Sequence, residues 1–161
     1  MAKKNVTAEQ ALIRLETLCA RSEQCQWELT RKMSTWGIDS STQDKIMRSL
    51  IDRRFVDDHR FAQAYCRDKF RFSRWGRLKI KAGLMQRFIS ANDIEDALSL
   101  IEDADYEAAL VALLRFKVKT IAEPQSYEGK TKLFRFAVSR GFEPSVAIAV
   151  IRGGKIWAGE D

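Results

Sequence analysis

Hydrophobic residues recur along the chain at the spacing of one helix face, and no stretch alternates with period two for long enough to predict a strand. The first apolar stripe consists of Ala11, Leu12, Leu15 and Leu18. It follows the sequence TAEQ, in which Thr7 and Gln10 have the spacing of a capping box. The sequence therefore predicts an all-α protein whose first helix begins near Thr7.

A helical pattern occurs three times. LTRKMSTWGIDSSTQDKIMRSL, which starts at Leu29, aligns at an offset of 51 residues with IKAGLMQRFISANDIEDALSLI, which starts at Ile80. A third copy, LFRFAVSRGFEPSVAIAVI, starts at Leu133, at an offset of 104 residues. Each copy predicts a helix, a tight turn at GI, FI or GF, and a second helix. With one further helix ahead of each pair, we expect three tandem three-helix (helix-turn-helix-like) repeats in an elongated, curved array.

Turn chemistry supports this alignment. Gly37 and Gly141 can adopt the left-handed conformation that ends a helix, and Pro144 suits a first helical position. Helix-capping acceptors are expected at Ser40, Asn92 and Glu143, and the leading helices are expected to begin near Thr7, Asp58 and Asp105. The expected ranges are a flexible N-terminus at 1–6, repeat 1 at 7–53, repeat 2 at 54–103, repeat 3 at 104–153 and a flexible C-terminal tail at 154–161.

Positive charge is concentrated in one part of the chain. Lys and Arg together number 28 and Asp and Glu 22, for a net charge of +6. From Arg67 to Arg87, eight cations accompany one acid, Asp68, so this segment alone has an excess of 8 − 1 = +7. A basic excess of this kind favours an anionic partner.

On a helix at 100° per residue, the cations and the apolar residues of this region separate into two stripes. The cationic stripe consists of Arg60, Arg67, Arg71 and Arg74. The apolar stripe consists of Phe61, Tyr65 and Phe72, and the next helix continues a buried line through Ile80, Leu84 and Phe88. Phe70 and Trp75 lie off the apolar stripe, where they could stack on bases, dock on a protein or pack against a neighbouring repeat. The shortage of acids favours a contact surface over an ordinary solvated face.

The candidate contact residues are Arg60, Arg67, Lys69, Arg71, Arg74, Trp75, Arg77, Lys79, Lys81 and Arg87. Asp57 and Asp58 are adjacent residues at a helix start, which favours a structural helix cap over a catalytic acid pair. The single histidine, His59, and three widely spaced cysteines lack the spacing of a zinc site. RGGK at Arg152 lacks the phosphate-loop spacing. We therefore expect no catalytic residues, no metal and no cofactor.

Three further features concern the cellular setting. No apolar stretch approaches the roughly 20 residues that span a bilayer, and the N-terminus lacks the apolar region of a secretory signal. Cys19, Cys25 and Cys66 are odd in number and lie in helical patterns, which favours reduced, packed thiols. We expect a cytoplasmic protein without membrane contact, and a monomer.

FVDDHRFAQAYCRDKFRFSRWGRLKI, together with ARSEQCQWEL at Ala20 and the three helical units, resembles the RecX family of bacterial regulators of the RecA recombinase. The similarity is most specific at Asp57, Asp58, Arg60, Phe61 and Ala62. The family usually has glycine where this chain has Arg54. The resemblance implies a non-enzymatic inhibitor that lies in the groove of the RecA filament on single-stranded DNA, lowers its ATP hydrolysis and strand exchange, and so acts in recombination, repair and SOS regulation.

Two other classes remain open from the residues alone. A stand-alone nucleic-acid-binding protein of tri-helical repeats would use the same basic face, with single-stranded DNA or, weakly, duplex DNA as its ligand. A helical adaptor would carry the basic face incidentally. Whether that face contacts protein or DNA is left undecided by the sequence.

Overall fold

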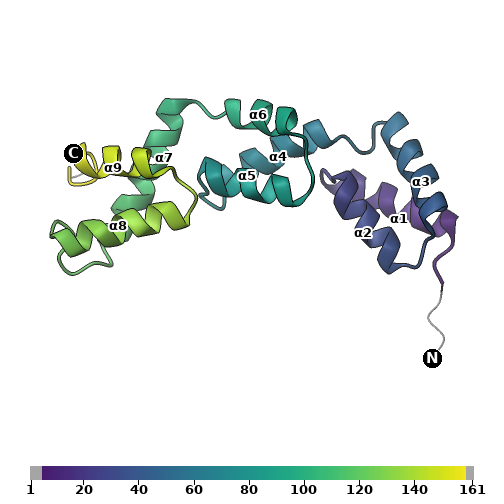
Figure 1. Ribbon diagram of the computed structural model, residues 1–161, viewed down its shortest axis with the longest axis horizontal. Helices are drawn as coiled ribbons and strands as arrows, with labels where there is room; N and C mark the ends of the chain where they lie inside the picture. The colour runs from purple at the N-terminus through teal and green to yellow at the C-terminus, as the bar shows by residue number, and fades with distance from the viewer. Residues whose placement is uncertain (1–4, 159–161) are drawn as a thin grey trace.

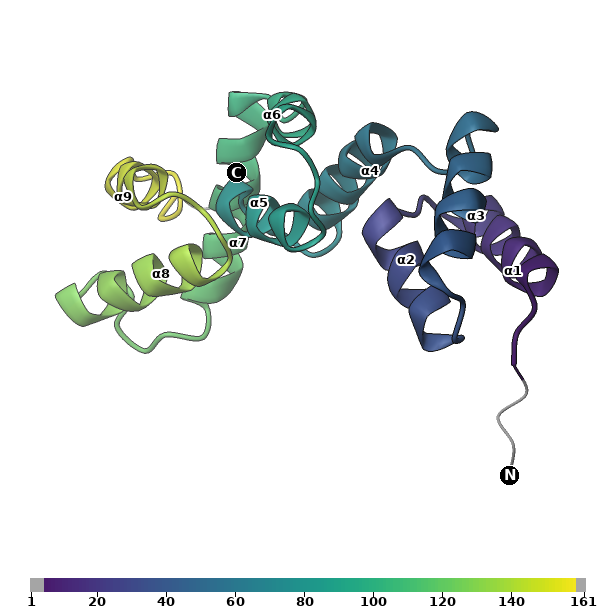
Figure 2. The same cartoon turned by 45° about the vertical axis from the view of Figure 1, so that its right-hand side comes forward.

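The computed structural model describes residues 5–158, which form nine α-helices and no strand. Repeat 1 comprises α1 (Ala8–Arg21), α2 (Gln26–Thr35) and α3 (Ser40–Asp52). Repeat 2 comprises α4 (Asp58–Arg71), α5 (Arg77–Gln86) and α6 (Ala91–Ser99). Repeat 3 comprises α7 (Asp103–Val118), α8 (Tyr127–Ser139) and α9 (Pro144–Arg152). The three triplets follow one another along the long axis of the molecule (Figure 1), and the turned view in Figure 2 keeps the same order. The predicted array of three-helix repeats is confirmed.

Each repeat has its own apolar core. Leu15, Leu29, Met33 and Leu50 are fully buried in repeat 1, Ile80 and Leu84 in repeat 2, and Leu110, Leu133 and Phe142 in repeat 3. Several side chains cross these boundaries, among them Cys25 and Phe70. Cys25, from the connection between α1 and α2, is buried in the core of repeat 2, and Phe70 of α4 packs against the cores of repeats 2 and 3. The repeats are therefore joined by shared apolar side chains as well as by the chain.

The helix ends largely follow the predicted chemistry. Thr7 and Gln10 form the capping box, Pro144 begins α9, and Gly37 and Gly141 adopt left-handed conformations with φ of 76° and 92°. Arg54, where the related family usually has glycine, is also left-handed, with φ of 60°. The leading helix of repeat 3 begins at Asp103, two residues before the predicted Asp105.

Two predicted caps are wrong. The residues with extended backbone immediately before α3 and α6 are Asp39 and Ser90, and these side chains accept the capping hydrogen bonds in place of Ser40 and Asn92. Glu143 does occupy the N-cap position of α9, but its carboxylate makes no capping hydrogen bond. It is held by groups from repeats 2 and 3 instead, as described below.

The expected flexible C-terminal tail packs at its start. Ile156 is only 4% exposed in the core of repeat 3, and the carbonyl oxygen of Lys155 accepts hydrogen bonds of 3.0 and 2.7 Å from Arg115. Val6, in the expected flexible N-terminus, packs against the core of repeat 1. Residues 1–4 and 159–161 lie outside the described residues.

Two sequence-level features of the chain are reflected in the structure. Cys19, Cys25 and Cys66 are free thiols, as predicted, and Cys25 and Cys66 are buried. Between residues 5 and 158, no helix has the length and apolar character needed to cross a membrane.

Candidate functional site

The two adjacent aspartates at the start of α4 serve two different helices. Asp57 is the N-cap of α4 and accepts a hydrogen bond of 3.1 Å from the backbone N–H of Arg60. Asp58 points to repeat 1, where its carboxylate accepts hydrogen bonds from the Gln26 backbone N–H at 2.9 Å and the Gln26 side chain at 3.3 Å. The N-cap residue of α2, Cys25, makes no side-chain cap of its own. Asp58 therefore caps α2, and burial raises the pKa of its carboxyl group.

Arg60 and Arg87 bind repeat 1 to repeat 2. The guanidinium of Arg60 lies 2.6 Å from Glu23 and donates to the carbonyl oxygens of Arg54 and Phe55. The guanidinium of Arg87 lies 2.8 Å from Glu28, and it also covers the ring of Tyr65 at 5.0 Å. Together with Asp58 and Gln26, these two ion pairs form a polar connection that we call joint 1–2. Both arginines thus have acidic partners that their surroundings in sequence do not reveal.

Arg77 has the corresponding role between repeats 2 and 3. Its guanidinium lies 2.8 Å from Asp103, 3.5 Å from Glu143 and 3.9 Å from the ring centroid of Tyr106. The Tyr106 hydroxyl accepts a hydrogen bond from the Arg77 backbone N–H at 3.0 Å and donates one to Glu143 at 2.7 Å. Burial raises the pKa of Tyr106, so the phenol stays protonated and can donate.

The main chains also meet here. The Gly76 N–H donates to the Arg140 carbonyl at 2.7 Å, and the Leu78 N–H donates to the Gly141 carbonyl at 2.9 Å. A Cβ atom at Gly76 would overlap the backbone of Gly141 and Phe142. We call this connection, with the contacts of Arg77 and Tyr106, joint 2–3.

Lys69, Trp75 and Lys79 form a stack of cations and aromatic rings. Both ammonium groups lie 4.7 Å from the indole centroid of Trp75. Lys69 also lies 5.5 Å from the ring of Tyr65, which packs edge-on against Trp75 at 6.4 Å. Phe70, the other aromatic considered for base stacking, instead stacks on Tyr106 at 6.0 Å in the interior. Trp75 and Phe70 are both half-buried, and Trp75 is the one of the two with lysines over its ring.

Four of the candidate cations are exposed: Arg67, Arg71, Arg74 and Lys81. Arg67 makes a contact of 3.4 Å with its neighbour Asp68, and the other three have no ion-pair partner among residues 5–158. Arg60, Arg67 and Arg71 share one face of α4, as their spacing predicts, but Arg74 does not continue that stripe. Arg60 is held by repeat 1, and α4 ends at Arg71, so that Arg74 lies in a left-handed turn with φ of 57°. The cationic surface therefore bends at the end of the helix.

Two phenylalanines predicted to be buried are exposed. Phe72 is 80% exposed because it is the C-cap of α4 and lies beyond the last helical turn. Phe88 is 77% exposed because α5 ends at Gln86 and Phe88 occupies the left-handed position that follows. In both places the apolar periodicity continues in the sequence after the helix has ended.

Sequence reasoning missed the share of repeat 1 in this region. Three residues of repeat 1 bind polar groups of repeat 2: Glu23 pairs with Arg60, Glu28 pairs with Arg87, and Gln26 donates to Asp58. The indole of Trp27 lies beside the same joint, and the guanidinium of Arg31 lies 4.7 Å from its ring centroid. All of these residues except Arg31 fall within RSEQCQWEL, a segment already noted for its resemblance to a known family. The resemblance of that segment to the family was the available signal.

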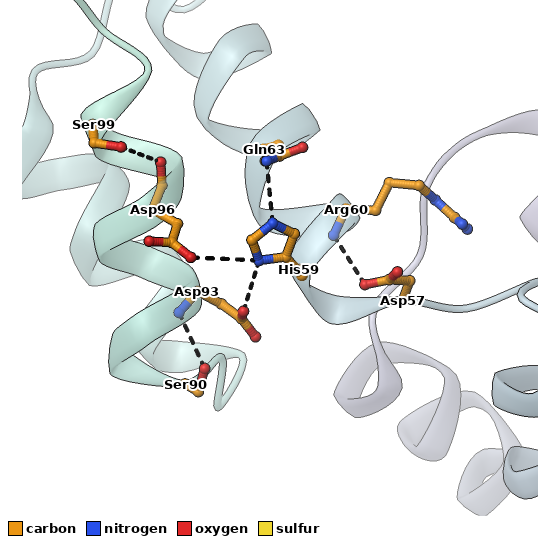
Figure 3. A network of polar contacts seen from close by, with 8 residues as sticks. All are labelled: Asp57, His59, Arg60, Gln63, Ser90, Asp93, Asp96 and Ser99. Carbon is orange, nitrogen blue, oxygen red and sulfur yellow. Dashed lines mark hydrogen bonds and ion pairs between the residues drawn. The ribbon is translucent and has the colours of Figure 1, made fainter.

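His59 joins α4 to α6 inside repeat 2 (Figure 3). Its Nδ1 atom lies 2.8 Å from Asp93 and 3.9 Å from Asp96, and its Nε2 atom lies 3.2 Å from the amide of Gln63. The hydrogen bond to Asp93 raises the pKa of His59. The ligand atoms of His59, Asp93 and Asp96 lie within 4.8 Å of one another, so these are the residues between 5 and 158 that could share a metal ion. The contact at 2.8 Å is that of an ion pair between imidazole and carboxylate.

Comparisons with known proteins identify relatives of this chain. Residues 57–98 match the family model described as RecX, second three-helix domain. The regulatory protein RecX of Neisseria meningitidis is 31% identical over 127 residues, which cover 78% of this chain and 78% of that protein. The RecX of Clostridium tetani is 31% identical over 126 residues, 76% of this chain and 56% of that protein.

The chain spans 59% of the length of the RecX of Clostridium perfringens strain SM101, at 29% identity over 127 residues. It thus covers less than two thirds of these two clostridial relatives. The crystal structure of RecX from Lactobacillus salivarius has the same fold, with a TM-score of 0.79 at 22% identity over 91% of this chain and 95% of that one. With three stacked triplets, a matching second triplet and a relative aligned over 78% of both lengths, the chain belongs to the RecX family.

Proposed function

We propose that the protein is a negative regulator of the RecA recombinase, which binds the groove of the RecA filament on single-stranded DNA and inhibits ATP hydrolysis and strand exchange. The observation that carries this proposal is membership in the RecX family, whose relatives bear the name regulatory protein. The elongated array of repeats supports it, because a row of small helical units can follow a helical groove. The activity requires binding alone, without a catalytic residue of this chain.

The contact surface that we propose consists of the exposed cations Arg67, Arg71, Arg74 and Lys81 and the stack formed by Lys69, Trp75 and Lys79. Arg71, Arg74 and Lys81 have no ion-pair partner among residues 5–158, so their charge is available to an anionic partner. Arg60, Arg77 and Arg87 serve this surface indirectly, because their ion pairs hold the three repeats together. Replacing them would disturb the array as well as the contact.

The test is single-stranded-DNA-dependent ATP hydrolysis by RecA with this protein added. We expect inhibition by the unmodified chain, and about tenfold weaker inhibition when Arg67, Arg71 and Arg74 are all changed to Glu. The matched control changes Lys130, Lys132 and Arg135, which are exposed on α8, to Glu; it alters the net charge equally and should inhibit normally. Absence of inhibition by the unmodified chain at several-fold excess over filament sites would refute the proposal.

A second candidate function, binding of nucleic acid without RecA, is favoured by the Trp75 stack. Aromatic rings beside lysines are typical of single-strand binding surfaces, where bases stack and phosphates meet cations. Binding of a thymidine oligonucleotide should then fall steeply between 50 and 200 mM salt, with each neutralised phosphate adding about 0.7 to the slope. Duplex DNA should bind more weakly. Binding no better at low salt than that of a neutral control protein would remove this candidate.

A further inference from the structure

A groove of about 1080 Å³ runs between α5 and α6 of repeat 2 and is distinct from the cation–aromatic stack. The two helices lie side by side in both views (Figures 1 and 2). The groove has an apolar floor of Ile94, Leu98 and Ile101. The ion pair between Arg77 and Asp103, at 2.8 Å, closes it toward repeat 3. At its other end stand the exposed side chains of Met85 and Phe88.

Phe88 occupies a conformation that a side chain of its kind rarely adopts. Its φ is 55°, and the repeat alignment places Gly37 and Gly141 at the same position in repeats 1 and 3, with φ of 76° and 92°. Glycine accepts this conformation without strain, whereas a bulky aromatic residue does not. The ring is 77% exposed and contributes little to the core of repeat 2; its aromatic neighbour is Trp27 of repeat 1, with 6.3 Å between the ring centroids. Strained backbone that presents an exposed side chain is a feature of binding sites.

Met85 extends the apolar end of the groove. It is 58% exposed and lies in the last turn of α5, three residues before Phe88, and both residues line the groove. Methionine side chains are flexible and polarisable, and they are common on surfaces that receive apolar side chains of a partner. Together, Met85 and Phe88 form an exposed apolar entrance to a groove that already has an apolar floor.

The two walls of the groove carry opposite charges. Lys81 lies on the α5 wall, whereas Glu95 and Glu102 line the opposite side, on α6 and just after it. None of the three has an ion-pair partner among residues 5–158. From Arg77 to Phe88 the wall extends over about 16 Å, enough for roughly three turns of a helix. The complementary occupant is an amphipathic helix with apolar residues one turn apart, acidic residues along one flank and basic residues along the other.

We propose that this groove binds an amphipathic helix of a protein partner, with Phe88 and Met85 as apolar anchors, the acidic flank beside Lys81 and the basic flank beside Glu95 and Glu102. The inference rests on the proposed function in one respect, because the RecA filament is taken as the partner that presents the helix. It adds a second contact, apolar in its centre, to the cationic surface.

The central experiment replaces Phe88 with Gly in the full chain. Glycine suits the left-handed backbone, so the variant should unfold at a urea concentration equal to or above that of the unmodified chain. Its inhibition of RecA ATP hydrolysis should be about tenfold weaker, because an anchor side chain is lost. Phe116→Gln is the matched control. It removes a ring that is 67% exposed on α7, outside the groove, and should inhibit normally.

A second variant, Glu95→Lys, distinguishes a helix with a basic flank from a purely anionic partner. The affinity of the Glu95→Lys variant for the proposed helix should be about threefold to tenfold lower than that of the unmodified chain. An anionic partner such as DNA would bind it more tightly, which would contradict the proposal.

The remaining outcomes are also decisive. If the unmodified chain inhibits RecA and Phe88→Gly inhibits equally well, the groove proposal is wrong and the proposed function stands. If the unmodified chain does not inhibit RecA, both are wrong. If sedimentation shows that the unmodified chain dimerises and Phe88→Gly does not, a second copy of this chain occupies the groove and the proposal is overturned.

Discussion

Joint 2–3 and joint 1–2 connect similar three-helix units by different means. In joint 2–3 the main chains touch: Gly76 and Leu78 donate hydrogen bonds to the carbonyls of Arg140 and Gly141. In joint 1–2, among residues 5–158, no main-chain hydrogen bond links a helix of repeat 1 to a helix of repeat 2. The polar contacts are the ion pairs of Arg60 and Arg87 and the cap formed by Asp58. The apolar contacts are those of Cys25 and Trp27 with repeat 2.

This difference affects how firmly each pair of repeats is held. Backbone contacts tolerate no change of angle without breaking hydrogen bonds, so repeats 2 and 3 should behave as one body. Long charged side chains can follow a rotation, and salt screens them where they are exposed. The guanidinium groups and carboxylates of joint 1–2 are between 25% and 40% exposed. We therefore expect repeat 1 to reorient relative to repeat 2 more readily than repeat 3 does.

The strongest test of the comparison is Gly141→Ala in joint 2–3. Its Cβ atom would overlap Lys79, and its φ of 92° disfavours any side chain, so we expect a loss of about 3 kcal/mol in the free energy of unfolding. Gly37→Ala is the matched control, because Gly37 has a similar φ of 76° but open space around it, and it should lose only about 1 kcal/mol. Urea unfolding followed by circular dichroism measures both. Equal losses would mean that the backbone contact in joint 2–3 adds nothing.

Tyr106→Phe weakens the same joint without changing its shape. The substitution leaves the Arg77 backbone N–H and the Glu143 carboxylate without the hydroxyl between them, and we expect a loss of about 2 kcal/mol. Tyr127→Phe, at a ring that is 88% exposed, should change the free energy of unfolding by less than about 0.5 kcal/mol. Similar values for the two variants would show that the buried hydroxyl is unimportant.

Asp58→Ala weakens joint 1–2, and we expect a smaller loss in the free energy of unfolding than for the variants in joint 2–3. Loss of the α2 cap should lower the free energy of unfolding by about 1 kcal/mol, and so should Asp39→Ala, which removes the cap of α3 within repeat 1. Small-angle X-ray scattering should separate the two variants, because only Asp58→Ala frees repeat 1 to reorient and changes the radius of gyration. An unchanged radius for Asp58→Ala would indicate that the arginine ion pairs alone set the angle.

The smallest effect is expected at His59, which lies within repeat 2 and in neither joint. The hydrogen bond to Asp93 raises its pKa above the ordinary value near 6.5. The protonated pair therefore stabilises the fold below pH 6.5, and this contribution is lost as the pH rises through the raised pKa. His59 is the only histidine, so its NMR titration is unambiguous. Asp93→Asn should return the pKa toward 6.5, and a titration that is the same in both proteins would contradict the pairing.

Local patterns predicted the repeats correctly, whereas distant partners decided the roles of the cations. Helical periodicity, the capping box at Thr7 and the left-handed Gly37 depend on residues a few positions apart. Arg60 and Arg87, in contrast, are paired with acids 37 and 59 residues away. No sequence pattern in one repeat states how the next repeat is oriented.

Phe88 shows a second limit. Ile80, Leu84 and Phe88 follow the spacing of one helix face, yet the first two are buried and the third is exposed. Periodicity alone does not state where the helix ends, and a phenylalanine is an unusual residue for the left-handed position after it. The alignment with Gly37 and Gly141 held the information that this position is a turn.

Cys25 has a consequence for synthesis on the ribosome. Its thiol is buried among side chains of repeat 2, where burial raises its pKa to about 11 and makes it unreactive. The last of those neighbours, Ala97, is translated roughly 70 residues after Cys25, which takes about 4 to 14 s at usual elongation rates. Throughout that interval the buried environment that raises the pKa of Cys25 is incomplete. The N-terminal repeat thus leaves the ribosome first but becomes chemically protected only when its successor has folded.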